Sequence, residues 1–231
     1  MIIDLHTHTF PASDDSFLSI EALIEAAKHA GLDALCLTDH DYFWDEDLVS
    51  KLSAKHNFLL LPGSEINTDE GHLLVFGLHR YTFGMHNVSY VKELTEEAGA
   101  AVIVAHPYRR RYSPSSHENG LSYREILEST RQQGVFTFAD AVEVRNGRGT
   151  ANENLFSQDL VSRAPLRGVG GSDAHKANDI GTFATKFDAT VSGLKDLIAE
   201  LKGGRFSPIA LKESNSPLPA GKRSQAWKMP R

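Results

Sequence analysis

Short apolar runs alternate with longer segments of helical period along most of this chain. The apolar runs cover residues 1–6, 33–40, 57–66, 72–78, 100–107, 140–146 and 166–173. Between them, apolar side chains recur at the spacing of one helix face at about 19–30, 45–55, 87–98, 122–133, 151–163 and 191–202. This alternation is typical of βα units around a parallel sheet, so we expect an α/β fold.

The length and composition suit one domain with a substantial core. The chain has 231 residues, of which 41% are hydrophobic and 23% charged, and we find no repeat or linker that divides it. We therefore expect a single domain over residues 1–211. The stretch from Ser214 to Arg231 contains three prolines, four basic residues and no acidic one. We expect residues 212–231 to be a loosely ordered extension of that domain.

The net charge and the single cysteine limit the expected partners and location. A formal net charge of −6 argues against long nucleic acids as partners, because their phosphates attract basic surfaces. Cys36 is the only cysteine, so no intrachain disulfide can form, and we expect a cytoplasmic protein. We find no signal-peptide pattern and no apolar stretch near the roughly 18 residues of a membrane span, so we expect no membrane partner.

Nearly every apolar run ends in a residue type that binds metal ions. These residues are His6, His8, Asp39, His40, Glu65, His106, Asp173 and His175. In parallel α/β folds the carboxyl ends of the strands lie at one rim, so side chains that are distant in the sequence meet there. The sequence therefore predicts one metal-binding site at that rim.

The types of donor limit which metals could bind, and the number of donors indicates how many ions. Imidazole together with carboxylate suits zinc, manganese or iron, and so many donors exceed the needs of one ion. We therefore expect two or three divalent ions. Asp39 and His40 are adjacent and would point to opposite sides of a strand. We expect His40 to be a ligand and Asp39 to orient a ligating imidazole.

Five motifs, in chain order, resemble those of the polymerase and histidinol phosphatase (PHP) family: "DLHTHT", "LTDHD", "GSEI", "AHPY" and "GSDAH". The resemblance covers nearly the whole chain up to about residue 211. It implies a distorted, TIM-like (β/α)7 barrel with two or three metal ions at its C-terminal rim, and the hydrolysis of phosphoesters. Matched motif by motif, it implies as metal ligands His6, His8, His40, Glu65, His106, Asp173 and His175.

Two further ligand positions each have two candidates. Small phosphoesterases of the family carry "SDG" shortly after the first motif, and its aspartate is a ligand. Here "ASDDS" offers Asp14 and Asp15, and we favour Asp14. A further histidine follows the "GSEI" motif in the family, and "GHLLVFGLH" offers His72 and His79 on opposite strand faces. We favour His72, which follows the Glu65 loop closely.

Substrate-binding residues are expected on the loops "AHPYRRRY" and "EVRNGR". We expect Arg109 and Arg145 to hold the phosphoryl group, because guanidinium groups bind phosphate oxygens in bidentate fashion. Asn146 is a further candidate, and Tyr108 either stacks on a base or covers the rim. We expect His175, or a histidine that is not bound to metal, to protonate the leaving group.

The resemblance implies a metal-dependent phosphatase that uses a metal-bridging hydroxide on a small phosphorylated substrate. Nucleotides or nucleoside bisphosphates are the favoured substrates, because small members of the family act on them and both loops are rich in arginine. Histidinol phosphate and the end of an oligonucleotide are alternatives within the family. A third alternative is an amidohydrolase-type barrel, which hydrolyses carbon–nitrogen bonds.

Overall fold

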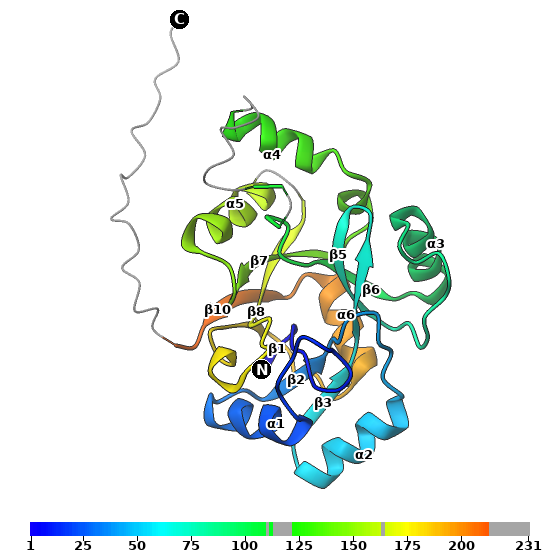
Figure 1. Ribbon diagram of the computed structural model, residues 1–231, viewed down its shortest axis with the longest axis vertical. Coiled ribbons are helices and arrows are strands. Elements are labelled where there is room, and N and C mark those ends of the chain that lie inside the picture. The colour runs from blue at the N-terminus through cyan, green and yellow to red at the C-terminus, as the bar shows by residue number, and fades with distance from the viewer. Residues whose placement is uncertain (110, 113–121, 163–164, 213–231) are drawn as a thin grey trace, which may run out of the picture.

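Two five-stranded sheets and six α-helices make up the part of the chain that the computed structural model describes, residues 1–109, 111–112, 122–162 and 165–212 (Figure 1). The strands are β1 (Ile2–Asp4), β2 (Ala34–Leu37), β3 (Leu59–Pro62), β4 (Ser64–Thr68), β5 (Gly71–Phe76), β6 (Ala101–Val104), β7 (Ala141–Asn146), β8 (Arg167–Gly171), β9 (Phe183–Phe187) and β10 (Phe206–Ala210). The helices are α1 (Ile20–His29), α2 (Glu46–His56), α3 (Val88–Ala98), α4 (Tyr123–Arg131), α5 (Ala151–Val161) and α6 (Leu194–Gly203). Two short 3-10 helices are η2 (Gly134–Thr137) and η3 (Ala177–Asp179).

The six expected helices are confirmed, and polar caps fix where most of them begin. Ser19, Asp45 and Asn87 accept hydrogen bonds from the first turns of α1, α2 and α3. Capping boxes at Ser122 and Thr150 start α4 and α5. No helix in the described ranges is long and apolar enough to cross a membrane. The expected loose extension lies almost wholly in residues 213–231, outside the described residues.

The first sheet has the strand order β10-β9-β1-β2-β3. Strands β1, β2 and β3 are parallel, with Ile3 opposite Ala34 and Ala34 opposite Leu59. Strand β9 runs antiparallel to both β1 and β10. The second sheet has the order β4-β5-β6-β7-β8, in which β4, β5 and β6 are antiparallel neighbours and β6, β7 and β8 are parallel.

The α/β class is confirmed, but the ladders of the described strands do not close into the expected (β/α)7 barrel. The run at 57–66 is two strands in different sheets, β3 and β4, with Gly63 between them. Only Asp69 and Glu70 connect β4 to β5, and so short a link permits an antiparallel pair but no parallel crossover. These two features separate the sheets and interrupt the parallel order.

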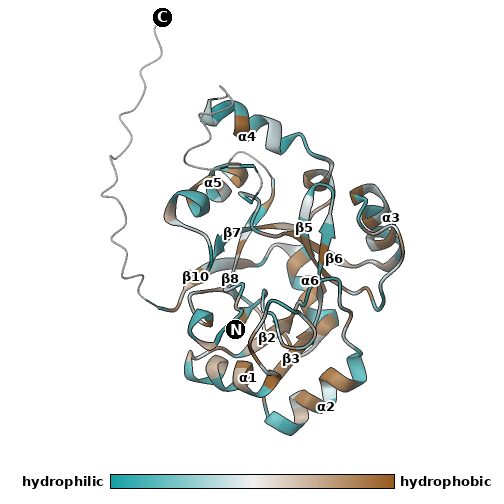
Figure 2. Ribbon diagram, in the orientation of Figure 1, coloured by the Kyte–Doolittle hydropathy of each residue, from teal (hydrophilic) through white to brown (hydrophobic). Residues whose placement is uncertain are grey.

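The main core lies between the two sheets. It joins Ile3 and Leu61 of the first sheet to Phe76 and Ile103 of the second, and Leu197 of α6 packs into it. Further apolar clusters bury α1 and α2 against the first sheet and α3 against the second. Figure 2 shows apolar residues along the central strands and α6, in contrast to the largely hydrophilic α4.

The carboxyl ends of parallel strands from both sheets meet at one place. An isolated parallel β-bridge joins Thr7, which follows β1, to Ala174, which follows β8. A second bridge joins His40, which follows β2, to Glu65 on β4. The two sheets therefore contact each other where the sequence places its metal-binding residue types.

Candidate metal centre

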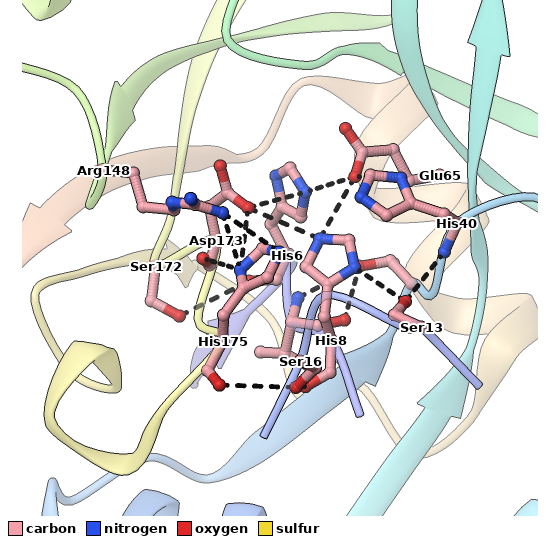
Figure 3. A network of polar contacts seen from close by, with 12 residues as sticks. His6, His8, Ser13, Ser16, His40, Glu65, Arg148, Ser172, Asp173 and His175 are labelled. Carbon is pink, nitrogen blue, oxygen red and sulfur yellow. Dashed lines mark hydrogen bonds and ion pairs between the residues drawn. The ribbon is translucent and has the colours of Figure 1, made fainter. Parts of the chain in front are cut away.

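Nine side chains converge where the two sheets meet. They form four overlapping groups whose ligand atoms lie within 4.8 Å of one another: His8, Asp15, His40 and His175; His6, His106 and Asp173; His6, His8 and Glu65; and His40, Glu65 and His72. Figure 3 shows imidazoles from several loops around the carboxylates of Glu65 and Asp173. The groups share members, so they form one continuous cluster of side chains that could hold metal.

Backbone hydrogen bonds hold the segment with His6 and His8 beside the segment with Asp173 and His175. Asp173 N donates to His6 O at 2.9 Å, and His8 N donates to Ala174 O at 3.0 Å. The segments "HTH" and "DAH" therefore run in parallel register, which puts His6 and His8 next to Asp173 and His175. Asp173 has a left-handed φ of 53°, which strains a non-glycine residue and turns the chain at this point.

Glu65 is the centre of the cluster and is fully buried. Its Oε2 lies 3.1 Å from Nε2 of His6, 3.1 Å from Nε2 of His8 and 3.2 Å from Nδ1 of His40. Its Oε1 lies 2.7 Å from Nδ1 of His72 and 2.8 Å from Nε2 of His106. One carboxylate cannot hydrogen-bond five imidazoles well, whereas carboxylate and imidazole ligands do gather closely where a metal ion binds.

Three buried atoms of the cluster support a metal site directly. Nε2 of His8 and Nδ1 of His40 lie within 3.2 Å of Glu65 Oε2, but neither these nitrogens nor Oδ1 of Asp173 makes a contact with hydrogen-bond geometry among the described residues. A buried polar atom without a partner destabilises a fold, so such atoms gathered in one place indicate a missing ligand. Imidazole and carboxylate donors without cysteine fit zinc, manganese or iron.

The protonation states also suit cation binding. Burial opposes ionisation of Glu65 and Asp173, but the positive charge of His6 and the other facing imidazoles hold the pKa of both carboxyls well below its ordinary range. Burial lowers the pKa values of His40, His106 and His175, which favours neutral imidazoles. At His8, facing carboxylates outweigh burial and raise the pKa to about 9. A bound cation would therefore replace a proton there.

Comparison with protein families agrees with this donor set. The family model for the PHP domain matches residues 4–136, more than half of the chain, and a PHP-associated model matches residues 151–206. The chain belongs to the PHP family. The resemblance of its motifs to those of PHP proteins is thereby confirmed.

Individual relatives of this PHP chain are distant. The probable histidinol-phosphatase of Thermotoga maritima is 24% identical over 240 residues, which cover 91% of this chain and 95% of that protein. The solved structure of PsfC from Pseudomonas syringae has a TM-score of 0.59 at 18% identity and covers 90% of this chain and 91% of that one. A two-domain protein from Bacteroides vulgatus, which contains a predicted PHP-like metal-dependent phosphoesterase, also has a TM-score of 0.59, at 20% identity over 91% of this chain and 64% of that one. The two structures share the fold of this chain.

Of the alternatives Asp14 or Asp15 and His72 or His79, the structure places Asp15 and His72 in the cluster. Oδ2 of Asp15 lies 2.9 Å from Nε2 of His175, and the metal groups include Asp15 but not the favoured Asp14. His72 joins Glu65 as expected, whereas the exposed His79 pairs with Glu46 on α2.

Asp39 does not contact a cluster imidazole directly, as expected, but through a serine side chain. Its carboxylate accepts hydrogen bonds from Thr9 N, from Trp44 Nε1 at 2.8 Å and from Ser13 Oγ at 2.8 Å. Ser13 Oγ in turn lies 3.2 Å from Nδ1 of His8. Asp39 therefore orients His8 through Ser13, and this arrangement leaves Nε2 of His8 available to a metal ion.

Glu143, inside β7, is a functional residue that the sequence reasoning missed. It is buried, and its Oε1 lies 3.1 Å from Nδ1 of His6. Its Oε2 accepts hydrogen bonds from His106 N at 2.8 Å and from Asn146 Nδ2 at 3.0 Å. A glutamate at a buried position of the apolar run "DAVEVRN" is the signal that could have found it.

Two arginines lie at the cluster, but Arg145 is not one of them. Arg109 donates to Asp173 Oδ2, and its Nη1 lies 3.0 Å from Nε2 of His106. Arg148 Nη1 lies 3.0 Å from both ring nitrogens of His175. Arg145 instead lies over the ring of Phe183, 5.5 Å from its centroid, because a bulge in β7 follows Glu143. Arg148 thus takes the place expected for Arg145.

Asn146 and Tyr108 hold members of the cluster in place through hydrogen bonds and do not line the cavity beside it. Asn146 is fully buried, and its Nδ2 donates to Asp173 Oδ2 at 3.1 Å. Tyr108 donates to Asn146 Oδ1 at 3.0 Å and packs among apolar side chains of α4 and α5, so it covers the rim. Nδ1 of His175 lies 2.8 Å from Asp173 O, and its Nε2 lies 2.9 Å from Oδ2 of Asp15, within one of the groups that could hold metal. This position suits a metal ligand better than the expected acid.

Proposed function

We propose that this PHP protein is a metal-dependent phosphoesterase that hydrolyses a small phosphomonoester. The observation that carries the proposal is the set of three unpartnered ligand atoms, on His8, His40 and Asp173, inside a cluster flanked by two arginines. The donors suit cations, and the guanidinium groups suit a phosphoryl group. Together they favour an anionic ester as the substrate.

The overlapping donor groups support two or three ions. One group would use His6, His106 and Asp173, another His40, Glu65 and His72, and a third His8, Asp15, His40 and His175. Glu65 belongs to two of the four donor groups, so its carboxylate would serve more than one of them. Ions bound there would lower the pKa of a water molecule and neutralise charge on the phosphoryl oxygens.

The arginines of the chain perform the recognition in this proposal. Arg109 and Arg148 contact neighbouring members of the cluster, Asp173 and His175, so a phosphoryl group at the ions would lie within reach of both. A cavity of about 410 Å³ adjoins the cluster, and its lining includes His72, His106 and Arg109. This volume suits a small leaving group such as a nucleoside.

Histidinol phosphate is the second candidate substrate, because the curated relative from Thermotoga maritima is named a probable histidinol-phosphatase. Glu153, which also lines the cavity, is an acidic group that could pair with an amine on such a leaving group. Nucleotides lack a primary amine of this kind. The two candidates therefore differ in their expected dependence on Glu153.

A phosphate-release assay tests the proposal. Protein treated with a chelator is reloaded with manganese, zinc, iron or magnesium and offered nucleoside monophosphates, nucleoside bisphosphates, histidinol phosphate and a short oligonucleotide. We expect release that depends on added metal and is lost in Asp173→Ala, with a nucleotide as the best substrate. Metal binding without release from any compound would contradict the proposal and favour hydrolysis of a carbon–nitrogen bond.

A further inference from the structure

Arg109 lies between the metal cluster and the adjoining cavity. About a third of its side chain is exposed (33%), and its guanidinium spans two metal-binding side chains, Asp173 and His106. It also lines the cavity of about 410 Å³ together with Tyr112 and Glu153. The same side chain therefore contacts both the candidate metal ligands and the space proposed for substrate.

The contact with His106 conflicts with metal binding. Nε2 of His106 lies 3.0 Å from Arg109 Nη1 and 2.8 Å from Glu65 Oε1. An imidazole nitrogen carries either one proton or one in-plane lone pair. The lone pair that would accept a hydrogen bond from Arg109 is the one that would bind an ion, so the two interactions exclude each other.

The contact with Asp173 does not conflict. Arg109 and Asn146 both donate to Oδ2 of Asp173, while Oδ1 has no hydrogen-bond partner in the described part of the chain. A metal ion can therefore bind Oδ1 while Arg109 keeps its hold on Oδ2. Arg109 can leave His106 and yet remain attached at the edge of the site.

We propose that Arg109 competes with a metal ion for Nε2 of His106, and that metal loading frees Nη1 of its guanidinium toward the cavity, where Nη1 binds the anionic group of the substrate while Nη2 stays on Asp173. The second half of this inference rests on the proposed function. Arg109 thus couples the two binding events, because an anion that holds the freed Nη1 also favours metal at His106. Linkage makes this coupling reciprocal: metal promotes anion binding, and anion promotes metal binding.

Zinc titrations of chelator-treated protein against a chromophoric chelator test the competition, with and without inorganic phosphate. We expect Arg109→Met to bind one zinc ion about tenfold more tightly than the unsubstituted protein. Arg109→Lys keeps the charge but loses the planar fork, so we expect a smaller gain. Phosphate should tighten zinc binding in the unsubstituted protein and have a much smaller effect in Arg109→Met.

Arg124→Met, on α4, is the matched control, and its zinc affinity should not change. Thermal melting of each variant checks that it folds. Equal zinc affinity in Arg109→Met and the unsubstituted protein, or an equal phosphate effect in both, would overturn the proposal. The zinc titration needs no catalytic turnover. A failure of the proposal about Arg109 can therefore be told apart from a failure of the proposed phosphatase activity.

Discussion

At the scale of single residues, buried acceptors decide which atom of each imidazole faces the metal cluster. Glu143 contacts Nδ1 of His6 and also fixes the backbone of His106, whose φ of 24° is strained. Ser13, which donates a hydrogen bond to Asp39, likewise contacts Nδ1 of His8. The geometry of the cluster therefore depends on side chains that would touch neither ion nor substrate.

We expect Glu143→Gln to weaken metal binding by about 10–100-fold, because a neutral amide holds the proton on Nδ1 of His6 less firmly. The fold should survive, since the amide keeps the size of the carboxylate. Competition titration with zinc measures the change. Glu128→Gln, on the exposed side of α4, is the control. Unchanged zinc affinity in Glu143→Gln would show that this carboxylate does not set the orientation of His6.

The two arginines of the "EVRNGR" loop should respond differently to the same substitution. We expect Arg148→Met to raise KM for a phosphomonoester about tenfold, since it removes a charged contact to the phosphoryl group. Arg145→Met should leave KM within about twofold, because Arg145 packs on Phe183. Steady-state phosphate release measures both. A larger rise in KM for Arg145→Met than for Arg148→Met would reverse our assignment of the two side chains.

The sequence could predict the candidate metal ligands that the structure brings together better than the residues around them. Candidates such as His6, His8, Asp173 and His175 lie at strand ends with regular spacing, which the local pattern reveals. Glu143 and Arg148 acquire their contacts only when β7 reaches β8 and the bulge after Glu143 turns Arg145 away. Spacing along the chain does not encode that bulge, and so Arg145 and Arg148 could not be distinguished.

At the scale of elements, the helices were predictable because amphipathic period and capping residues act locally. The strands β9 and β10 were not, since "FATKF" and "FSPIA" are short and mix apolar with polar residues. They pair with each other, and β9 pairs with β1. Such long-range pairing stabilises strands whose local signal is weak. The separation of β3 from β4 was hidden for the opposite reason, because both strands lie in one continuous apolar run.

Gly63, between β3 and β4, should be intolerant of a side chain. A Cβ there would lie 2.6 Å from the ring of Phe76, which is fully buried, and 3.1 Å from Thr38. We expect Gly63→Ala to destabilise the fold by about 1–3 kcal/mol through overpacking. Urea unfolding measures the loss. Gly193→Ala is the matched control, because a Cβ there meets nothing within 4 Å and should leave stability near that of the unsubstituted protein. Equal stability of the two variants would mean that the junction relaxes around the methyl group.

At the scale of the whole molecule, the metal cluster joins two sheets whose ladders are otherwise separate. Its ligands come from the ends of β1 and β2 in the first sheet and from β4, β5, β6 and β8 in the second. Bound ions would link both halves, so binding free energy would add to the stability of the entire fold. We expect metal to raise the melting temperature of chelator-treated protein.

That stabilisation should depend on pH in a defined direction. Burial alone would lower the pKa of His8, but Asp173 and Glu65 raise it to about 9, well above the ordinary value of 6.5. A raised folded-state pKa contributes stability that is complete below about pH 6.5 and is lost as the pH rises through about 9. Chelator-treated protein should therefore melt at progressively lower temperature from about pH 7.5 to 9.

Metal-loaded protein should lose less stability over the same interval, because ions must displace the protons of His6 and His8 and do so more easily as the pH rises. The rise in melting temperature on adding zinc should accordingly grow from about pH 7.5 to 9. His8→Gln lacks one of these titrating groups, so its chelator-treated form should lose less stability across that interval. Calorimetric melting of both proteins, with and without zinc, measures the trends. If the effect of zinc were constant with pH, the ions would not be binding in place of protons on these histidines.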